Sequence, residues 1–180
     1  IRWYSLSYIF GLILGWIYCK KILIKDPIIL KLFEDYFSFL IIGIIVGGRI
    51  GYIIFYNLTY FISNPLEIFM IWNGGMSFHG GMLGVIISSY IFSKKNNKNI
   101  FIFLDLVAIT SPVGIFLGRI SNFINGELVG KLTNSNWGVL FPTYDDKLRH
   151  PSQLYEAFLE GIILFILMNF IFFTKNYKIG

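Results

Sequence analysis

The chain has 180 residues, of which 56% are hydrophobic and only 14% are charged. Soluble domains contain about 25% charged residues, so this composition excludes an ordinary soluble domain and favours a membrane protein. The net charge of +5 does not indicate a nucleic-acid partner, because the lysines lie in short loops between apolar runs and not along a basic stripe.

Five long apolar runs follow one another along the chain, covering residues 3–18, 36–56, 77–92, 100–117 and 152–173. Backbone groups in lipid must be hydrogen-bonded within the protein, so each run is predicted to form a transmembrane helix. The expected fold class is all-α, a polytopic integral membrane protein with one membrane domain over residues 1–180. Glycines spaced four apart, such as Gly43 and Gly47 or Gly80 and Gly84, are typical of helices that pack closely in lipid.

Two segments between the runs are less apolar. Residues 57–76, which contain Pro65 and Glu67, are predicted to form an interfacial arm and outer loop. Residues 118–151 are predicted to form a small extracytoplasmic head, too short to hold a separate core. Lysines follow the first, third and fifth runs, so these ends are predicted to face the cytoplasm, with the N-terminus outside.

Ionisable side chains within or beside apolar runs are costly, and each is therefore a candidate functional residue. Arg49 lies within the second run, His79 opens the third, and Arg119 is predicted to cap the fourth. All three map to the outer half of the membrane. Guanidinium groups bind phosphate through two parallel hydrogen bonds, so this placement indicates a site for a lipid headgroup.

Simpler interpretations stand beside these. Arg49 is equally well explained by an ion pair with Glu127 or Glu156, and His79 by a structural histidine at a helix start. Arg149 is explained by a solvated charge or a headgroup anchor. Arg119 with Asn122, Asn125 and Glu127 is harder to explain as packing, because four polar side chains crowd the mouth of an apolar helix.

The run from His150 to Gln153 is a plausible helix start, because proline suits the first turn of a helix. Gln153, Glu156 and Glu160 then share one helix face. With one cysteine, Cys19, and two histidines, no metal site is expected. No glycine-rich nucleotide loop is present either, so no cofactor is expected.

Five segments, in this order along the chain, resemble the bacterial prolipoprotein diacylglyceryl transferases. They are RWY at 2–4, GGRIGY at 47–52, GGMSFHGG at 74–81, RISNFINGEL at 119–128 and RHPSQLYE at 149–156. The family has seven membrane spans, so its last two spans are expected to be absent from these residues, and the chain is expected to be either a fragment or a reduced enzyme.

The resemblance implies a transferase of the bacterial inner membrane whose active face is extracytoplasmic. It would move the diacylglyceryl group of phosphatidylglycerol to the lipobox cysteine of a prolipoprotein, forming a thioether and releasing glycerol phosphate. Its partners would be phosphatidylglycerol, a lipobox peptide and membrane lipids. The competing classes are a non-catalytic phospholipid-binding subunit or transporter, and a headgroup phosphatase.

The resemblance and the polarity of the segments together give the predicted site. The residues expected to serve catalysis are His79, Arg119 and Tyr4. Those expected to bind substrate are Arg119, Asn122, Asn125, Glu127, Gly130 and Arg49. A free thiol has a pKa near 8.5, so the substrate thiol needs a base or a positive field to ionise. The sequence leaves open whether His79 or an arginine-assisted deprotonation provides it.

Overall fold

The computed structural model describes the backbone of residues 3–174 and the side chains of residues 6–174. The described chain folds as two compact units. We call residues 24–105 the arm unit, and residues 3–23 with 106–174 the head unit. Tyr4, Lys175 and Lys178, which enter the sequence predictions, lie outside the described side chains.

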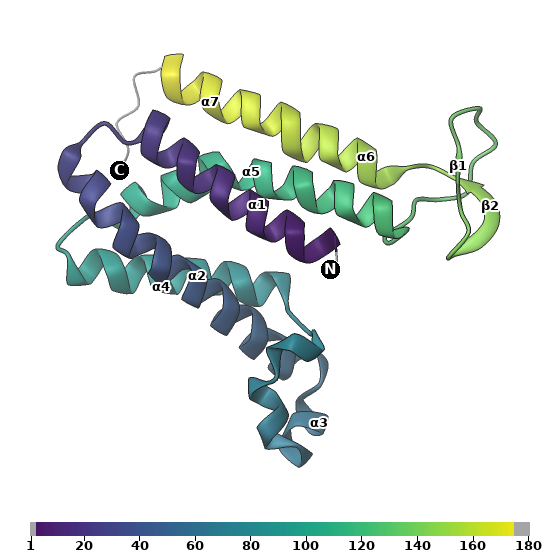
Figure 1. Cartoon of the computed structure of the whole chain (residues 1–180), viewed down its shortest axis with the longest axis horizontal. Coiled ribbons are helices and arrows are strands. Elements are labelled where there is room, and N and C mark those ends of the chain that lie inside the picture. The colour runs from purple at the N-terminus through teal and green to yellow at the C-terminus, as the bar shows by residue number, and fades with distance from the viewer. Residues whose placement is uncertain (1–2, 175–180) are drawn as a thin grey trace. The chain divides into compact units, whose positions relative to one another are not determined.

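The arm unit is built on a pair of helices, α2 (Pro27–Tyr56) and α4 (Phe78–Lys95), which lie side by side (Figure 1). Between them the chain forms α3 (Leu58–Ser63) and two short 3₁₀ turns, Pro65–Phe69 and Ile71–Asn73. These three elements occupy the segment predicted to be an interfacial arm. The first residues of α5 (Ile100–Asn125) complete the unit.

The helix α2 begins at Pro27, well before the predicted start of its apolar run. The Asp26 side chain caps it by accepting a hydrogen bond from the backbone N–H of Ile28 at 2.7 Å. Proline at the first helical position loses no intrahelical hydrogen bond and has a backbone angle suited to the helix. The charged turn that contains Lys31, Glu34 and Asp35 is thus helical although it is not apolar.

Glycines bring α2 and α4 into backbone contact, as their spacing predicts. A Cβ atom placed on Gly84 would overlap the carbonyl of Gly43, and one on Gly47 would overlap the carbonyl of Gly80. At the other end of the pair, Tyr36 is fully buried, and its hydroxyl lies 2.8 Å from the hydroxyl of Ser89. Small residues allow this approach, which yields close van der Waals contact and buries polar side chains between the helices.

The arm is held to α2 by Arg49, whose side chain is only 6% exposed. Its five N–H groups all donate to backbone carbonyls of the arm, at 2.5–3.3 Å. The acceptors are the carbonyls of Glu67, Ile68, Met70, Gly74 and Gly75. A guanidinium has five donors, so every one is engaged. The phenyl ring of Phe61 covers the guanidinium at 5.0 Å.

The head unit contains α1 (Trp3–Tyr18), a π-helical turn (Cys19–Leu23) and the greater part of α5. The chain then forms an antiparallel hairpin of β1 (Val139–Phe141) and β2 (Asp145–Arg149). It returns as one continuous helical stretch of α6 (Ser152–Glu156), a π-helical segment (Ala157–Ile163) and α7 (Leu164–Thr174). This stretch runs alongside α5 (Figure 1).

The helix α5 continues to Asn125, beyond the predicted end at residue 117. The prediction that Arg119 caps this span was therefore wrong, because Arg119 lies inside the helix. The sequence from 118 to 125 still follows a helical pattern, and the chain turns only at Gly126, whose φ is +68°. Glycine adopts that left-handed conformation without steric cost, which makes it a common helix terminator.

The polytopic α-helical class is confirmed. Among the described residues, four helices are long and apolar enough to cross a membrane: Leu6–Leu23, Pro27–Tyr56, Ile100–Asn125 and Ser152–Thr174. The remaining predicted span coincides with α4, which is helical but does not reach the same apolar composition. His79, Lys94 and Lys95, together with its glycines and serines, make α4 less apolar than the other four predicted spans.

The contact between α2 and α4 yields a first prediction. Gly84→Ala should destabilise the protein by about 1–3 kcal/mol, because its Cβ meets the unyielding backbone of Gly43. Gly81→Ala is the matched control, since its Cβ would lie 3.8 Å from the nearest atom, the carbonyl oxygen of Ile44. Thermal unfolding in detergent measures both. Equal midpoints for the two variants would show that close backbone packing is not what these glycines provide.

A second prediction concerns Arg49. Arg49→Lys keeps the positive charge but has one nitrogen in place of the planar fork, so it cannot reach all five carbonyls. Hydrogen exchange of backbone amides in residues 65–77 should accelerate, because each lost hydrogen bond to a charged donor costs about 1.5–3 kcal/mol. Arg149→Lys, in the head unit, should leave this exchange unchanged. An arm as protected in Arg49→Lys as in the parent protein would contradict the role.

Candidate active site

Arg119 lies at the centre of an ionic cluster in the head unit. Its Nη1 lies 2.8 Å from Oε2 of Glu156, and its Nη2 lies 3.2 Å from Oε2 of Glu160. The arginine side chain is 28% exposed and the two glutamates are 38% and 49% exposed. The cluster is thus open to its surroundings, unlike the enclosed guanidinium of Arg49.

The glutamates reach Arg119 because the helices cross closely. A Cβ atom on Gly161 would lie 2.7 Å from the Cβ of Phe116, one helical turn before Arg119 on α5. Glu156 ends α6, and Glu160 lies on the π-helical segment. Short π-helical insertions in α-helices are frequent at functional sites. The predicted common face of Glu156 and Glu160 is therefore the face that meets Arg119.

A polar loop follows α5 and completes this end of the helix. Asn122, one turn after Arg119, is only 4% exposed, and its carbonyl accepts from the N–H of Glu127 at 2.9 Å. The side-chain amide of Asn125 lies 3.5 Å from Oε1 of Glu127. The structure thus places Arg119, Asn122, Asn125 and Glu127 at the same end of α5, while the side-chain partners of Arg119 are Glu156 and Glu160.

The start of α6 holds that loop in place. The buried Gln153 donates from Nε2 to the Glu127 carbonyl at 2.6 Å, and the Ser152 hydroxyl donates to the Leu128 carbonyl at 3.1 Å. Leu128 has a φ of +53°, which is rare for a residue with a branched side chain and is found where the surroundings enforce it. Gln153 and Ser152 therefore hold the loop after α5 through its backbone carbonyls. Their position in a predicted helix start did not reveal this role.

Gly130 packs against His150, the residue that follows β2. A Cβ atom there would overlap the carbonyl of His150, so the absence of a side chain is needed by the protein's own packing. The Arg149 Nη1 donates to the Gly130 carbonyl at 3.0 Å, and its Nη2 lies 2.6 Å from Oδ2 of Asp145. The Arg149 guanidinium also holds the pKa of the Asp145 carboxyl below its usual range. Arg149 is thus a clamp within the head and not a solvated charge.

His79 belongs to the arm unit. Ser77 caps α4 by accepting from the N–H of Gly80 at 3.2 Å, and His79 follows in the first turn with an exposed ring. His79 therefore lies at a helix start, as its simpler interpretation as a structural histidine also requires. Arg49 lies in the same unit, and all its N–H groups donate to backbone carbonyls of the arm. These carbonyls take the place of the ion pair with Glu127 or Glu156 that the sequence suggested. Tyr4 lies in the first turn of α1, and its side chain is outside the described residues.

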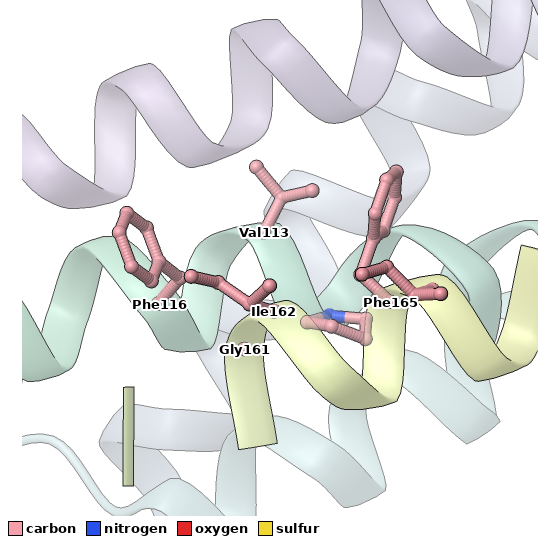
Figure 2. A pocket seen from close by; sticks show the side chains of 7 residues that line it. Val113, Phe116, Gly161, Ile162 and Phe165 are labelled. Atoms are coloured by element: carbon pink, nitrogen blue, oxygen red, sulfur yellow. The ribbon is translucent and has the colours of Figure 1, made fainter. Parts of the chain in front are cut away.

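An apolar groove of about 170 Å³ lies between α5 and the helical stretch that runs from the π-helical segment into α7 (Figure 2). Val113 and Phe116 of α5 form one side, and Gly161, Ile162 and Phe165 form the other (Figure 2). Phe116 lies one turn from Arg119, and Gly161 directly follows Glu160. Charged and apolar surfaces therefore adjoin at this point, which is the arrangement that a phospholipid requires. Within residues 6–174 no group of His, Cys, Asp or Glu side chains is arranged to hold a metal ion.

Glu160 was not among the predicted site residues, although it was placed on the same helix face as Glu156. Three glutamates, Glu127, Glu156 and Glu160, were equally available to an arginine on sequence grounds. The helix crossing at Gly161 determines which glutamates pair with Arg119, because it brings together residues 41 positions apart in the chain, Arg119 and Glu160. The only sequence signal for it is the glycine that follows Glu160.

The chain is similar in sequence to known proteins over nearly its whole length. The sequence profile of the family described as prolipoprotein diacylglyceryl transferase matches residues 1–179. The phosphatidylglycerol–prolipoprotein diacylglyceryl transferase of Rickettsia bellii (strain OSU 85-389) is 53% identical over 98% of this chain and 68% of its own length. The enzymes of that name from Rickettsia canadensis (strain McKiel) and Rickettsia rickettsii (strain Sheila Smith) are 51% and 50% identical, each over 98% of this chain and 69% of their own length. Because the profile covers nearly every residue, this chain belongs to the prolipoprotein diacylglyceryl transferase family.

Proposed function

We propose that this chain transfers the diacylglyceryl group of phosphatidylglycerol to the cysteine thiol of a prolipoprotein. The observation that carries the proposal is the Arg119 cluster, a partly exposed guanidinium beside an apolar groove in a membrane helix. The family and the names of its similar members support the same activity. A non-catalytic lipid-binding subunit or transporter finds no support among these relatives.

The reaction is a nucleophilic substitution at carbon. The thiol gives its proton to a base, and the thiolate sulfur attacks the carbon of the diacylglyceryl group that bears the phosphate. The new bond is a carbon–sulfur thioether bond. The carbon–oxygen bond breaks, and its electron pair leaves with the oxygen as glycerol phosphate. Negative charge therefore grows on the phosphate in the transition state, where a prearranged guanidinium stabilises it most.

Different residues are proposed to bind the phosphate, bind the headgroup and accept the proton. Arg119 is proposed to bind the phosphate, and Asn125 and Glu127 to bind the glycerol headgroup with amide and carboxylate groups suited to its hydroxyls. The buried Asn122 is proposed to support this end of α5. His79, exposed in the first turn of α4, is proposed as the base that receives the thiol proton. Tyr4 is proposed to act beside it.

The two remaining members of the predicted binding set act indirectly. Gly130 permits the close turn beside His150 that holds the loop after α5. Arg49 has no N–H left for a phosphate, and its contribution is to fix the arm that leads to His79. The acceptor is proposed to be a lipobox peptide, which reaches the site from the extracytoplasmic side in a bilayer of membrane lipids.

Arg119→Lys tests the transition-state role. Lysine keeps the charge but loses the planar, two-pronged donor geometry, so the rate should fall on the order of 10²–10³-fold with the protein still inserted. The measurement is thioether formation on a lipobox peptide in membranes, at several concentrations of phosphatidylglycerol. Near-parental turnover of the variant at saturating lipid would leave Arg119 as a binding residue only.

Orientation is tested separately. The lysines at 94, 95 and 98 predict a cytoplasmic loop, while Asn134 in the head is proposed to face outward. In a Cys19→Ser background, Asn134→Cys should react with a membrane-impermeant maleimide in intact cells. Asn97→Cys should react only after the cells are opened. The reverse pattern would place the active face in the cytoplasm and overturn the proposed topology.

A further inference from the structure

The Arg119 cluster has an excess of negative charge. One guanidinium faces two carboxylates, Glu156 and Glu160, so the formal charges of the three side chains sum to −1. A phosphatidylglycerol phosphate brings a further negative charge to the same guanidinium. Like charges at such separations repel strongly where the bilayer lowers the dielectric constant. The phosphate and both carboxylates therefore compete for one set of donors.

We propose that Glu160 is the exchangeable counter-ion of Arg119, which the lipid phosphate displaces on binding, while Glu156 stays and orients the guanidinium. The inference rests on the proposed function and makes Glu160 a determinant of lipid affinity. Displacement frees Nη2 of Arg119, because Nη2 is the atom that Glu160 contacts. The phosphate then occupies the position that the carboxylate leaves.

The geometry distinguishes the two glutamates. The Glu160 contact is the longer one, at 3.2 Å against 2.8 Å, and its side chain is the more exposed, at 49% against 38%. Glu156 belongs to the short helix α6, which Ser152 and Gln153 tie to the loop after α5. Glu160 lies on the π-helical segment, beyond those ties. The carboxylate with the longer contact is thus also the more exposed one, and it lies outside the contacts that hold α6 to the loop.

The surroundings of Glu160 suit the lipid that would replace it. The next residue, Gly161, lines the apolar groove with Phe116 and Phe165 (Figure 2). A phospholipid with its phosphate at Arg119 would have apolar surface nearby on α5, on the π-helical segment and on α7. The exchange therefore places the charged part of the lipid against a cation and an acyl chain against apolar side chains.

The test uses Glu160→Gln, which keeps the shape of the side chain and removes its charge. The apparent KM for phosphatidylglycerol should fall about three- to fivefold, the size expected for one partly exposed ion pair, with kcat within about twofold. Glu160→Asp keeps the charge and should retain the parental KM within about twofold. Glu156→Gln is the matched control, and it should lower kcat without lowering KM, because the guanidinium loses its orienting partner.

A binding measurement separates this inference from the proposed reaction. Thermal stabilisation of the solubilised protein is recorded against phosphatidylglycerol in mixed micelles, with diacylglycerol as the ligand that lacks phosphate. Glu160→Gln should shift the phosphatidylglycerol curve to about three- to fivefold lower concentration and leave the diacylglycerol curve in place. An unchanged or weakened phosphatidylglycerol response, or an equal gain for Glu156→Gln, would overturn the exchange. Absence of thioether in the parent protein would instead reject the proposed function, whatever the binding curves show.

Discussion

A charged group in an apolar medium must find its partners within the protein, and this constraint shapes both units. Arg49 and Arg119 meet it in opposite ways. Arg49 is enclosed by neutral carbonyls, which leave it no free donor and fix the backbone that supplies them. Arg119 is held by two partly exposed carboxylate side chains, and in our proposal the lipid phosphate replaces one of them, Glu160. The first arrangement is suited to architecture and the second to binding.

The same constraint explains the use of glycine in the helix contacts. Apolar burial does not drive helices together in lipid, so association depends on close packing and on polar contacts. The approach of α2 to α4 at Gly43 and Gly84 lets the buried tyrosine Tyr36 meet Ser89. The π-helical segment approaches α5 closely at Gly161 in the same way, and this approach places the glutamates on Arg119. Each close contact at a glycine thus brings polar side chains of two helices within reach of each other.

How far the sequence predicts this structure depends on the range of the interaction. Apolar runs identify the helices, because each run alone satisfies its backbone. The start of α2 at Pro27 was missed because its first turns are charged, although the Asp26-Pro27 pair is a recognisable helix start. The grouping of Arg119 with Asn122 and Glu127 was predictable, since all lie on one helix end. The partners of Arg49 were not, because five carbonyls converge only after the arm has folded.

A chain of local contacts links the enclosed arginine to the proposed base. Arg49 binds the carbonyls of Gly74 and Gly75, and both glycines have positive φ angles that turn the chain toward α4. The N–H of Ser77 then donates to the Gly48 carbonyl at 2.9 Å, next to Arg49 in α2, and the Ser77 hydroxyl caps the helix that carries His79. The backbone that leads into the first turn of α4 is therefore held by α2. A base on an exposed helix end gains reach toward a peptide thiol, and this anchoring removes the backbone freedom that would otherwise misplace it.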